Sequence, residues 1–325
     1  MLPPLVDLHL HLDGALRPST IVELASSLGL DGEEIVAGLA AIGAGRLDAY
    51  LAHFDAVLPL LQNAPALARV AEEAVLDAAD QGLGHVEVRI CPWQHQKDGL
   101  TLERATRAIL EGLQAGSRKT GLPAPMIVCL LHGMNEQEAN DLADLAVRLR
   151  PEGVAGLDLA GNESGGYRIE VFRRAFAVAA EGGLRRTVHA GEAGPGVHVR
   201  RAILELGAER IGHGTSILED EEAVALARDR GVTLECCLSS NLHTGAIARL
   251  EDHPLRAMMA AGLKVTLNTD NPTLSRTTLA REWALARQYL GLTEEEEGRL
   301  RQWAWDARFE PTPRLHRTGP LEEAR

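Results

Sequence analysis

The sequence predicts a single (β/α)8 TIM barrel with extra helices inserted after the first strand. Eight short β-rich segments alternate with amphipathic helical segments along its 325 residues. Strands separated by helices pair in parallel through right-handed crossovers, and eight such units are the number that closes a barrel. The length and the 45% hydrophobic content allow one large core, so we expect one domain over residues 1–325. An open, doubly wound parallel sheet is the alternative.

The predicted strands are Val6–Leu12, His85–Pro92, Met126–His132, Val154–Gly161, Arg186–Ala190, Arg210–Gly214, Val232–Ser239 and Lys264–Asp270. Between strands, apolar residues recur at helical spacing. Leu102–Leu113 predicts a helix before Gly116, and Ala139–Leu149 predicts another before Pro151, because glycine and proline commonly end helices. Near the carboxyl end, a threonine followed by four glutamates (293–297) predicts a capped helix start with a solvated acidic face.

The connection after the first strand is much longer than a plain crossover, so we expect an insertion at about 15–84 over one end of the barrel. Gly-Leu-Asp-Gly (29–32) and Ile-Gly-Ala-Gly (42–45) divide it into several helices. Within it, four apolar side chains share one helical face, namely Leu47, Tyr50, Leu51 and Phe54. That face either packs in the core or forms a lid over an apolar ligand.

The composition disfavours several classes of function. A formal net charge of −13 opposes binding to DNA or to an anionic membrane surface, and the chain has no basic block. The four cysteines follow no disulfide or zinc-finger spacing. No signal segment and no span of about eighteen apolar residues is present in the sequence. We therefore expect a reduced, cytoplasmic protein without a nucleic-acid or membrane partner.

The first strand carries two histidines one residue apart. Alternate side chains of a strand share a face, so His9 and His11 are expected to point to the same side. Two neutral imidazoles on a rigid face suit a divalent cation, and a catalytic zinc uses about three protein ligands and one open position. Because His-x-His also occurs on ordinary strand surfaces, further ligands must come from elsewhere in the chain.

Polar residues also stand at the carboxyl ends of strands five, six and eight. They are His189 and Glu192, His213, and Asp270. The carboxyl ends of barrel strands converge on one rim, where active sites are built. A single buried histidine is more often structural, but polar groups at four strand ends indicate a site. His189 and Asp270 can complete a set with His9 and His11, and three imidazoles with one carboxylate suit zinc.

The rest of this rim suits hydrolysis or hydrolytic deamination, because zinc lowers the pKa of a water that it binds to near neutrality. His213 can hydrogen-bond and orient that water, and Asp270 can accept its proton. Glu192 lies on the loop after strand five and is a candidate proton donor to the substrate. Alternatively, Glu192 is only a carboxylate near a helix start.

Five motifs run in order along most of the chain. They are Asp-Leu-His-Leu-His-Leu-Asp-Gly-Ala (7–15), Leu-Asp-Leu-Ala-Gly-Asn-Glu (157–163), Val-His-Ala-Gly-Glu (188–192), Ile-Gly-His-Gly (211–214) and Leu-Asn-Thr-Asp-Asn-Pro (267–272). Together they resemble the adenosine deaminase family of metal-dependent hydrolases. The resemblance implies one zinc per chain and replacement of the 6-amino group of a purine nucleoside by oxygen from water. The expected substrates are adenosine and 2′-deoxyadenosine, with release of ammonia.

Residue by residue, the resemblance implies four zinc ligands, which are His9, His11, His189 and Asp270. Glu192 matches the acid that protonates purine N1, and His213 matches the hydroxide-positioning histidine. Gly161 matches the glycine whose backbone N–H meets purine N3, and Asp13 matches the aspartate associated with the ribose hydroxyls. The family's apolar covering helix corresponds to Tyr50, Leu51 and Phe54.

Asn271 stands where the best-known members carry a second aspartate facing purine N7. Its amide can donate to N7 without a shifted pKa, so a purine still fits. Adenine deaminase and 6-aminodeoxyfutalosine deaminase activities stay open as alternatives. So do a phosphoesterase of the polymerase-and-histidinol-phosphatase type, a non-catalytic binding barrel, and a role of Asp13 in supporting a metal ligand. The oligomeric state is also left open.

Overall fold

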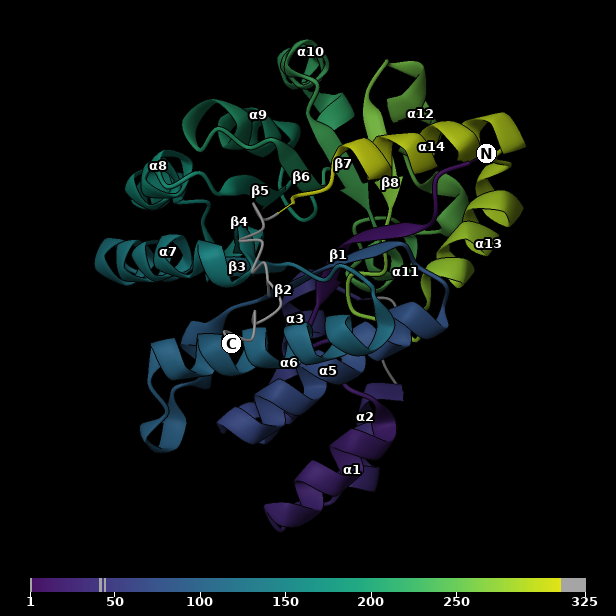
Figure 1. Ribbon diagram of the computed structural model, residues 1–325. Coiled ribbons are helices and arrows are strands. Elements are labelled where there is room, and N and C mark those ends of the chain that lie inside the picture. Colours follow the sequence, from purple (N-terminus) through teal and green to yellow (C-terminus); the bar gives the residue numbers. More distant parts are fainter. Residues whose placement is uncertain (1, 41–42, 44, 311–325) are drawn as a thin grey trace, which may run out of the picture.

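The computed structural model describes residues 2–40, 43 and 45–310, and its eight parallel strands form a nearly closed barrel (Figure 1). Each strand pairs with the next along the chain, from the first to the eighth. The eighth and first strands meet through a bridge between Leu10 and Asp270. There the N–H of His11 donates to the carbonyl of Asp270, and the N–H of Asp270 donates to the carbonyl of His9, both at 2.7 Å. The predicted barrel is confirmed, and the open sheet is wrong.

The strands are β1 (Val6–His11), β2 (His85–Ile90), β3 (Met126–Leu131), β4 (Val154–Ala160), β5 (Arg185–Ala190), β6 (Arg210–His213), β7 (Thr233–Cys236) and β8 (Lys264–Leu267). All eight predicted strands are present, although most end one to three residues earlier than predicted. The difference is largest at β7 and β8. A helix begins at Leu238 soon after β7, and the left-handed backbone of Asp270 (φ 63°) turns the chain away after β8.

The helices between β1 and β2 are α1 (Pro18–Ser27), α2 (Gly32–Ala40), α3 (Leu47–Leu51), α4 (Phe54–Val57) and α5 (Ala64–Asp80). Those that follow are α6 (Leu102–Thr120), α7 (Glu136–Leu149), α8 (Arg173–Glu181), α9 (Gly196–Glu205), α10 (Glu221–Arg230), α11 (Leu238–His243), α12 (Leu255–Ala260), α13 (Leu279–Leu290) and α14 (Glu294–Asp306). Most of these helices form a ring outside the strands, α1 and α2 lie beyond the ring, and α3 and α11 are seen within it (Figure 1).

The helical face expected at residues 47–54 is divided between two short helices. His53 lies in the turn between α3 and α4, and both its ring nitrogen Nδ1 and its backbone N–H lie 3.1 Å from the carbonyl of Tyr50. That carbonyl would otherwise accept the next helical hydrogen bond, so the side chain competes with the helix. The predicted break at 29–32 does separate α1 from α2. Ile42 and Ala44 of the second predicted break lie outside the described residues.

Two expectations about helix ends are wrong for physical reasons. The helix expected to stop before Gly116 continues to Thr120, because at Gly116 a Cβ would lie 2.6 Å from the Cβ of Val75 on α5, so glycine permits close packing there. The start of α14 has the expected capping box, formed by Thr293 and Glu296. Its acidic face is not wholly solvated, because Glu297 is buried and pairs with Arg287 at 2.6 Å.

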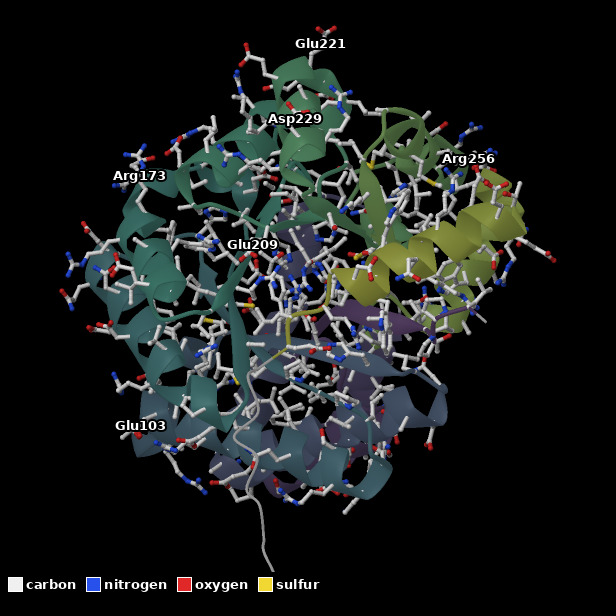
Figure 2. The ribbon with its side chains drawn as sticks, turned by 45° about the horizontal axis from the view of Figure 1, so that its top comes forward. Glu103, Arg173, Glu209, Glu221, Asp229 and Arg256 are labelled. Carbon is white, nitrogen blue, oxygen red and sulfur yellow. The ribbon has the colours of Figure 1, made fainter. Side chains whose placement is uncertain are left out.

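Side chains of β1 alternate between the outside and the inside of the barrel. Val6 and Leu8 pack outward against Ala304 of α14, whereas the alternate residues His9 and His11 point into the barrel. Charged side chains such as Glu103 and Arg256 project from the outer surface (Figure 2). Among the described residues, no helix has the length and apolar character needed to cross a membrane.

Candidate metal centre and active site

Four side chains meet at the carboxyl rim of the barrel. His9, His11, His189 and Asp270 each offer one ligand atom, and these atoms all lie within 4.8 Å of one another. The Nε2 atoms of His9 and His11 each stand 3.4 Å from Oδ1 of Asp270, and Nε2 of His11 lies 3.2 Å from that of His189. The structure thus brings together the four predicted ligands, which come from three widely separated parts of the chain.

These four residues fit a zinc ion. The Nε2 atom of His9 is buried and makes no hydrogen bond; its nearby partner is Oδ1 of Asp270, another candidate ligand, at 3.4 Å. Burial lowers the pKa of His11 well below its usual value, so its imidazole is neutral, which is the form that binds metals. Three imidazoles and one carboxylate are borderline ligands that suit zinc.

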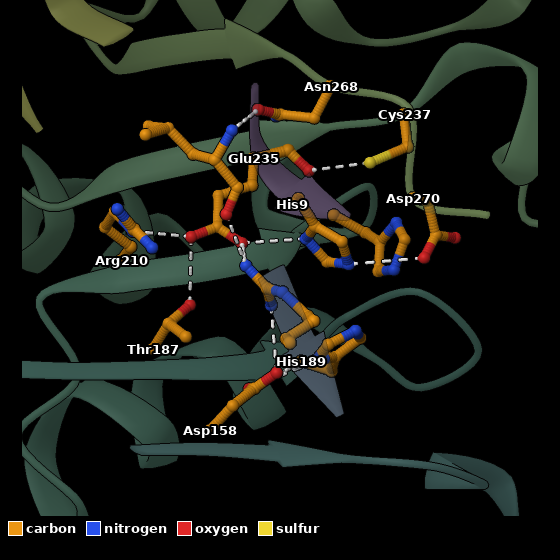
Figure 3. Close-up of polar contacts among 12 residues, drawn as sticks. His9, Asp158, Thr187, His189, Arg210, Glu235, Cys237, Asn268 and Asp270 are labelled. Atoms are coloured by element: carbon orange, nitrogen blue, oxygen red, sulfur yellow. Dashed lines mark hydrogen bonds and ion pairs between the residues drawn. The ribbon is translucent and has the colours of Figure 1, made fainter. Parts of the chain in front are cut away.

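The opposite ring nitrogens of two of these histidines are held by buried carboxylates. Nδ1 of His9 lies 2.7 Å from Oε2 of Glu235, and Nδ1 of His189 lies 3.1 Å from Oδ2 of Asp158. These contacts leave Nε2 of each ring as the nitrogen available to the four-ligand cluster; Figure 3 shows the contact of His9 with Glu235. Gly212 allows this packing, because a Cβ there would lie 3.0 Å from Cε1 of His9 and 3.1 Å from Cγ of His189. Such supporting carboxylates fix the tautomer and the ring orientation of metal ligands.

Two buried arginines neutralise these carboxylates. Arg89 contacts Asp158 at 2.9 Å and Glu235 at 2.8 Å, and all three side chains are fully buried. Arg210 contacts the other oxygen of Glu235 at 2.6 Å (Figure 3). Burial alone would raise the pKa of Glu235, but the charges of Arg89 and Arg210 hold that pKa well below its ordinary value. Phe309, which follows α14, stacks on Arg210, and its ring centroid lies 3.5 Å from the guanidinium carbon.

Glu192 lies on the loop after β5, beside the four-ligand cluster. Burial, followed by the negative charge of Asp270, raises the pKa of Glu192 to about 8, so this carboxyl is protonated at neutral pH. The loop is held by Glu163, whose carboxylate accepts the four consecutive backbone N–H groups of residues 191–194. His198 also contacts Glu163, at 2.7 Å. Glu192 is therefore a rigidly placed acid.

His213 lies against both the acid and the ligand cluster. Its Nε2 is 3.6 Å from Oε2 of Glu192, and its ring centroid is 4.9 Å from that of His9. Its backbone has a left-handed conformation (φ 63°), as does that of Asp270. Such conformations are strained for residues with a Cβ and cluster at functional sites. Ser240 Oγ donates to Oδ2 of Asp270 at 2.5 Å, which leaves Oδ1 facing the histidines.

A cavity of about 250 Å³ opens onto this cluster. All the predicted substrate contacts line it, namely Asp13, Tyr50, Leu51, Phe54, Gly161 and Asn271. The hydroxyl of Tyr50 lies 2.8 Å from Oγ of Ser275 on the loop after β8, which fixes α3 over the rim. Oδ1 of Asp13 and Oδ1 of Asn271 are buried without a hydrogen-bond partner. The cavity therefore offers polar atoms to a ligand beneath an apolar cover.

Several residues of the site are additions to the sequence-based prediction. The supporting network of Arg89, Arg210 and Glu235 was not anticipated, although Glu87 and Arg89 alternate within β2. In a strand buried on both faces, such charges indicate an inward-facing network. The cavity is also lined by side chains between the strands that no motif marked, including Asp55, Gln94, His132 and Thr244.

The sequence profile of the adenosine deaminase family matches residues 4–317. The chain belongs to this family. An adenosine deaminase of Clostridium kluyveri is 35% identical over 292 residues, which cover 88% of this chain and 84% of that protein. The family's activity makes the chain an aminohydrolase, as the resemblance implied.

Solved structures of related deaminases share this fold. An adenine deaminase from Arthrobacter aurescens has a TM-score of 0.87 and 29% identity, with 94% of each chain covered. The N6-mAMP deaminase of Arabidopsis has a TM-score of 0.85 and 27% identity, covering 95% of this chain and 93% of that one. An amidohydrolase from Burkholderia ambifaria with bound Zn has a TM-score of 0.82 and 27% identity, covering 95% and 86%. The same barrel thus occurs in deaminases named for different adenine compounds.

Proposed function

We propose that this member of the family deaminates adenosine and 2′-deoxyadenosine to inosine and 2′-deoxyinosine with release of ammonia. The observation that carries the proposal is the placement of Glu192, whose buried carboxyl lies 3.6 Å from Nε2 of His213 and lines the same cavity as the candidate metal ligands His11, His189 and Asp270. A protonated acid at that place can donate to N1 of a purine, which makes C6 electrophilic. A barrel that only bound ligands would not need a proton donor beside the metal ligands.

We infer one zinc ion per chain, held by His9, His11, His189 and Asp270. The donor set supports this metal, as does the bound Zn of the Burkholderia ambifaria amidohydrolase. When bound, zinc would lower the pKa of a water molecule toward neutrality and so supply the nucleophile. Only one such cluster is present among the described residues, which argues against a phosphoesterase that needs several metals.

The protein's own groups then have separate tasks. Glu192 protonates N1 of the base, and His213 orients the attacking water through its ring. Asp270 can accept the proton of that water, and Ser240 orients its carboxylate by donating to Oδ2. Asn271 lines the cavity, where its Nδ2 can donate to N7, and Gly161 lines the same cavity, where its backbone N–H can meet N3.

The charge of the cavity supports a nucleoside rather than a nucleotide. The lining residues in the described part of the chain include no lysine or arginine, but they include the carboxylates of Asp13 and Asp55. A 5′-phosphate would bring further negative charge into this low-dielectric space without a cation to pair with it. Free adenine, conversely, has no ribose hydroxyl to satisfy the buried Oδ1 of Asp13.

The zinc-loaded enzyme should be tested against adenosine, 2′-deoxyadenosine, adenine, AMP, N6-methyl-AMP and 6-aminodeoxyfutalosine. We expect the highest kcat/KM with the first two compounds, measured from the loss of adenine absorbance and the release of ammonia. A higher kcat/KM with a nucleotide or with free adenine would contradict the proposed substrate. Turnover of none of these compounds would reject the proposed deamination.

Asp13→Ala is expected to raise the KM for adenosine by about 10- to 100-fold, because the ribose loses a buried hydrogen-bonding partner. Zinc content should stay at one per chain, since Glu235 and Asp158, not Asp13, hold the ligand histidines. Steady-state kinetics and metal analysis check both statements. Loss of zinc with unchanged nucleoside affinity would instead assign Asp13 to the support of the metal centre.

The pH dependence of kcat/KM should show an alkaline limb. The acid form of Glu192 is the active form, so activity falls as pH rises through the pKa of this carboxyl, which is raised to about 8. The groups facing it are Asp270, Glu163, His213 and His9. A bound cation opposes the rise in pKa, so the midpoint of the limb should lie at or below about 8. Activity that continues to rise above this pH would exclude Glu192 as the acid.

We also propose that the enzyme works in a reducing compartment such as the cytoplasm. All four cysteines are buried free thiols, and Cys236 and Cys237, although adjacent in the chain, are not paired.

A further inference from the structure

We propose that Asn241 and His253 are positioning residues that fix the proton of His213 on Nε2 and hold Glu192 in place for proton donation. The proposal rests on the proposed deamination, because it assigns these residues to the same acid and the same histidine. Asn241 lies on α11, and His253 lies just before α12. Both are buried behind the active site, and neither lines its cavity.

The tautomer of His253 is set by the backbone. The N–H of Leu255 donates to Nδ1 of His253 at 3.1 Å, so this nitrogen is an acceptor and carries no proton. Burial lowers the pKa of His253 to about 4, and the ring is neutral at pH 7. Its single proton is therefore on Nε2, which lies 3.2 Å from Oδ1 of Asn241 and donates to it.

This donation fixes the orientation of the Asn241 amide. With Oδ1 facing His253, the nitrogen Nδ2 faces the active site, 3.0 Å from Nδ1 of His213 and 3.3 Å from Oε1 of Glu192. An amide nitrogen only donates, so Nδ1 of His213 must accept. A flipped amide would place its nitrogen against the Nε2–H of His253, and two donors would then face each other.

The proton of neutral His213 must therefore be on Nε2. This nitrogen lies 3.6 Å from Oε2 of Glu192, and the ring packs beside the imidazoles of His9 and His189. His213 is thus held as a hydrogen-bond donor toward an oxygen at the metal centre, which is the form that orients a nucleophile.

The same amide also affects the acid. Oε1 of Glu192 accepts from Nδ2 of Asn241 and, at 2.8 Å, from Oγ1 of Thr244. Two donors on Oε1 leave Oε2 to carry the acidic proton. Asn241 therefore sets which nitrogen of the histidine, and which oxygen of the acid, holds a proton.

The test uses Asn241→Asp in the zinc-loaded enzyme. The carboxylate has nearly the same shape and still accepts from His253, but it cannot donate to His213, whose proton is then drawn to Nδ1. We expect kcat with adenosine to fall by about 10- to 100-fold, with KM changed by less than about threefold and one zinc per chain retained. Nitrogen-15 NMR of labelled histidine, assigned with His213→Asn, should show the proton of His213 moving from Nε2 to Nδ1.

Two further variants separate positioning from simple structural support. His253→Gln can still donate through its side-chain amide to Oδ1 of Asn241, and it should retain more activity and the Nε2 proton than His253→Leu, which removes the donor. Asn63→Asp is the matched control, because an aspartate at this exposed helix cap still accepts the N–H of Ala66 and should change nothing.

A proton that stays on Nε2 of His213 in both Asn241→Asp and His253→Leu would overturn the proposal, as would wild-type kcat in these variants. The NMR measurement needs no turnover. If the enzyme deaminated none of the adenine compounds, the proposed function would fail, while the tautomer of His213 would still test the positioning role separately.

Discussion

Glu192→Gln is expected to lower kcat/KM for adenosine by about 10²- to 10⁴-fold, which is the usual contribution of a positioned general acid. Glutamine keeps the shape of the side chain and can still accept from Thr244, but it has no acidic proton to give to N1. Zinc content should remain at one per chain, because Glu192 is not among the four ligands. Steady-state kinetics and metal analysis on the same preparation check the two statements together.

The matched control is Glu219→Gln, which makes the same chemical change at an exposed residue outside the cavity. This control should keep wild-type kcat/KM. The alkaline limb of the pH profile should also disappear in Glu192→Gln, since the titrating carboxyl has been removed. If Glu192→Gln retained most of its turnover, another group would have to supply the proton.

Arg89→Met is expected to lower the free energy of unfolding by about 3–5 kcal/mol, because it leaves a buried ionic network without one of its cations. Asp158 and Glu235 are fully buried, and each contacts the guanidinium within 2.9 Å. The same change should weaken zinc binding by about 10- to 100-fold, because these carboxylates hold the ring nitrogens of two ligand histidines. Denaturant unfolding of the metal-free protein and competition with a zinc chelator measure the two effects separately.

Arg104→Met provides the comparison. Arg104 pairs with Glu111 at 2.7 Å, but both side chains are about half exposed, so the pair contributes about 0–1 kcal/mol. The two variants remove the same charged group from an exposed and a buried place. Equal stability of the two variants would contradict the role assigned to the buried network, and unchanged zinc affinity in Arg89→Met would separate that network from the metal ligands.

The strands and the four candidate ligands could be predicted because their signals are local or follow from topology. His9 and His11 share a face by strand geometry alone. His189 lies near the end of β5 and Asp270 follows β8, and these strand ends must meet in a closed barrel. The motif spacing then supplied Glu192 and His213. None of these inferences required the distance between two particular side chains.

The supporting residues could not be predicted in the same way. Glu235 and Arg89 lie 146 positions apart, and strands β2 and β7 are not neighbours in the barrel, so their contact depends on side chains that reach across its interior. In the sequence, Asn241 is an ordinary polar residue of a short helix. Its role depends on His253, whose tautomer is fixed by the backbone N–H of Leu255 and whose Nε2 contacts the Asn241 side chain. The break between α3 and α4 likewise depends on one histidine side chain that takes a backbone carbonyl.

Strands β8 and β1 meet through a single bridge, so a cation at the metal centre would also affect the closure of the barrel. His9 and His11 stand on one side of this contact and Asp270 on the other, so a single cation would join the two ends of the barrel chain. Nearby, Leu8 and Asn268 are also hydrogen-bonded across a sequence separation of 260 residues, so closure at this point is costly in chain entropy. Such a cation would serve as a non-covalent cross-link, and its binding free energy would be linked to barrel closure. Amide hydrogen exchange at His11 and Asp270 should therefore be slower in the zinc-loaded protein than after chelation.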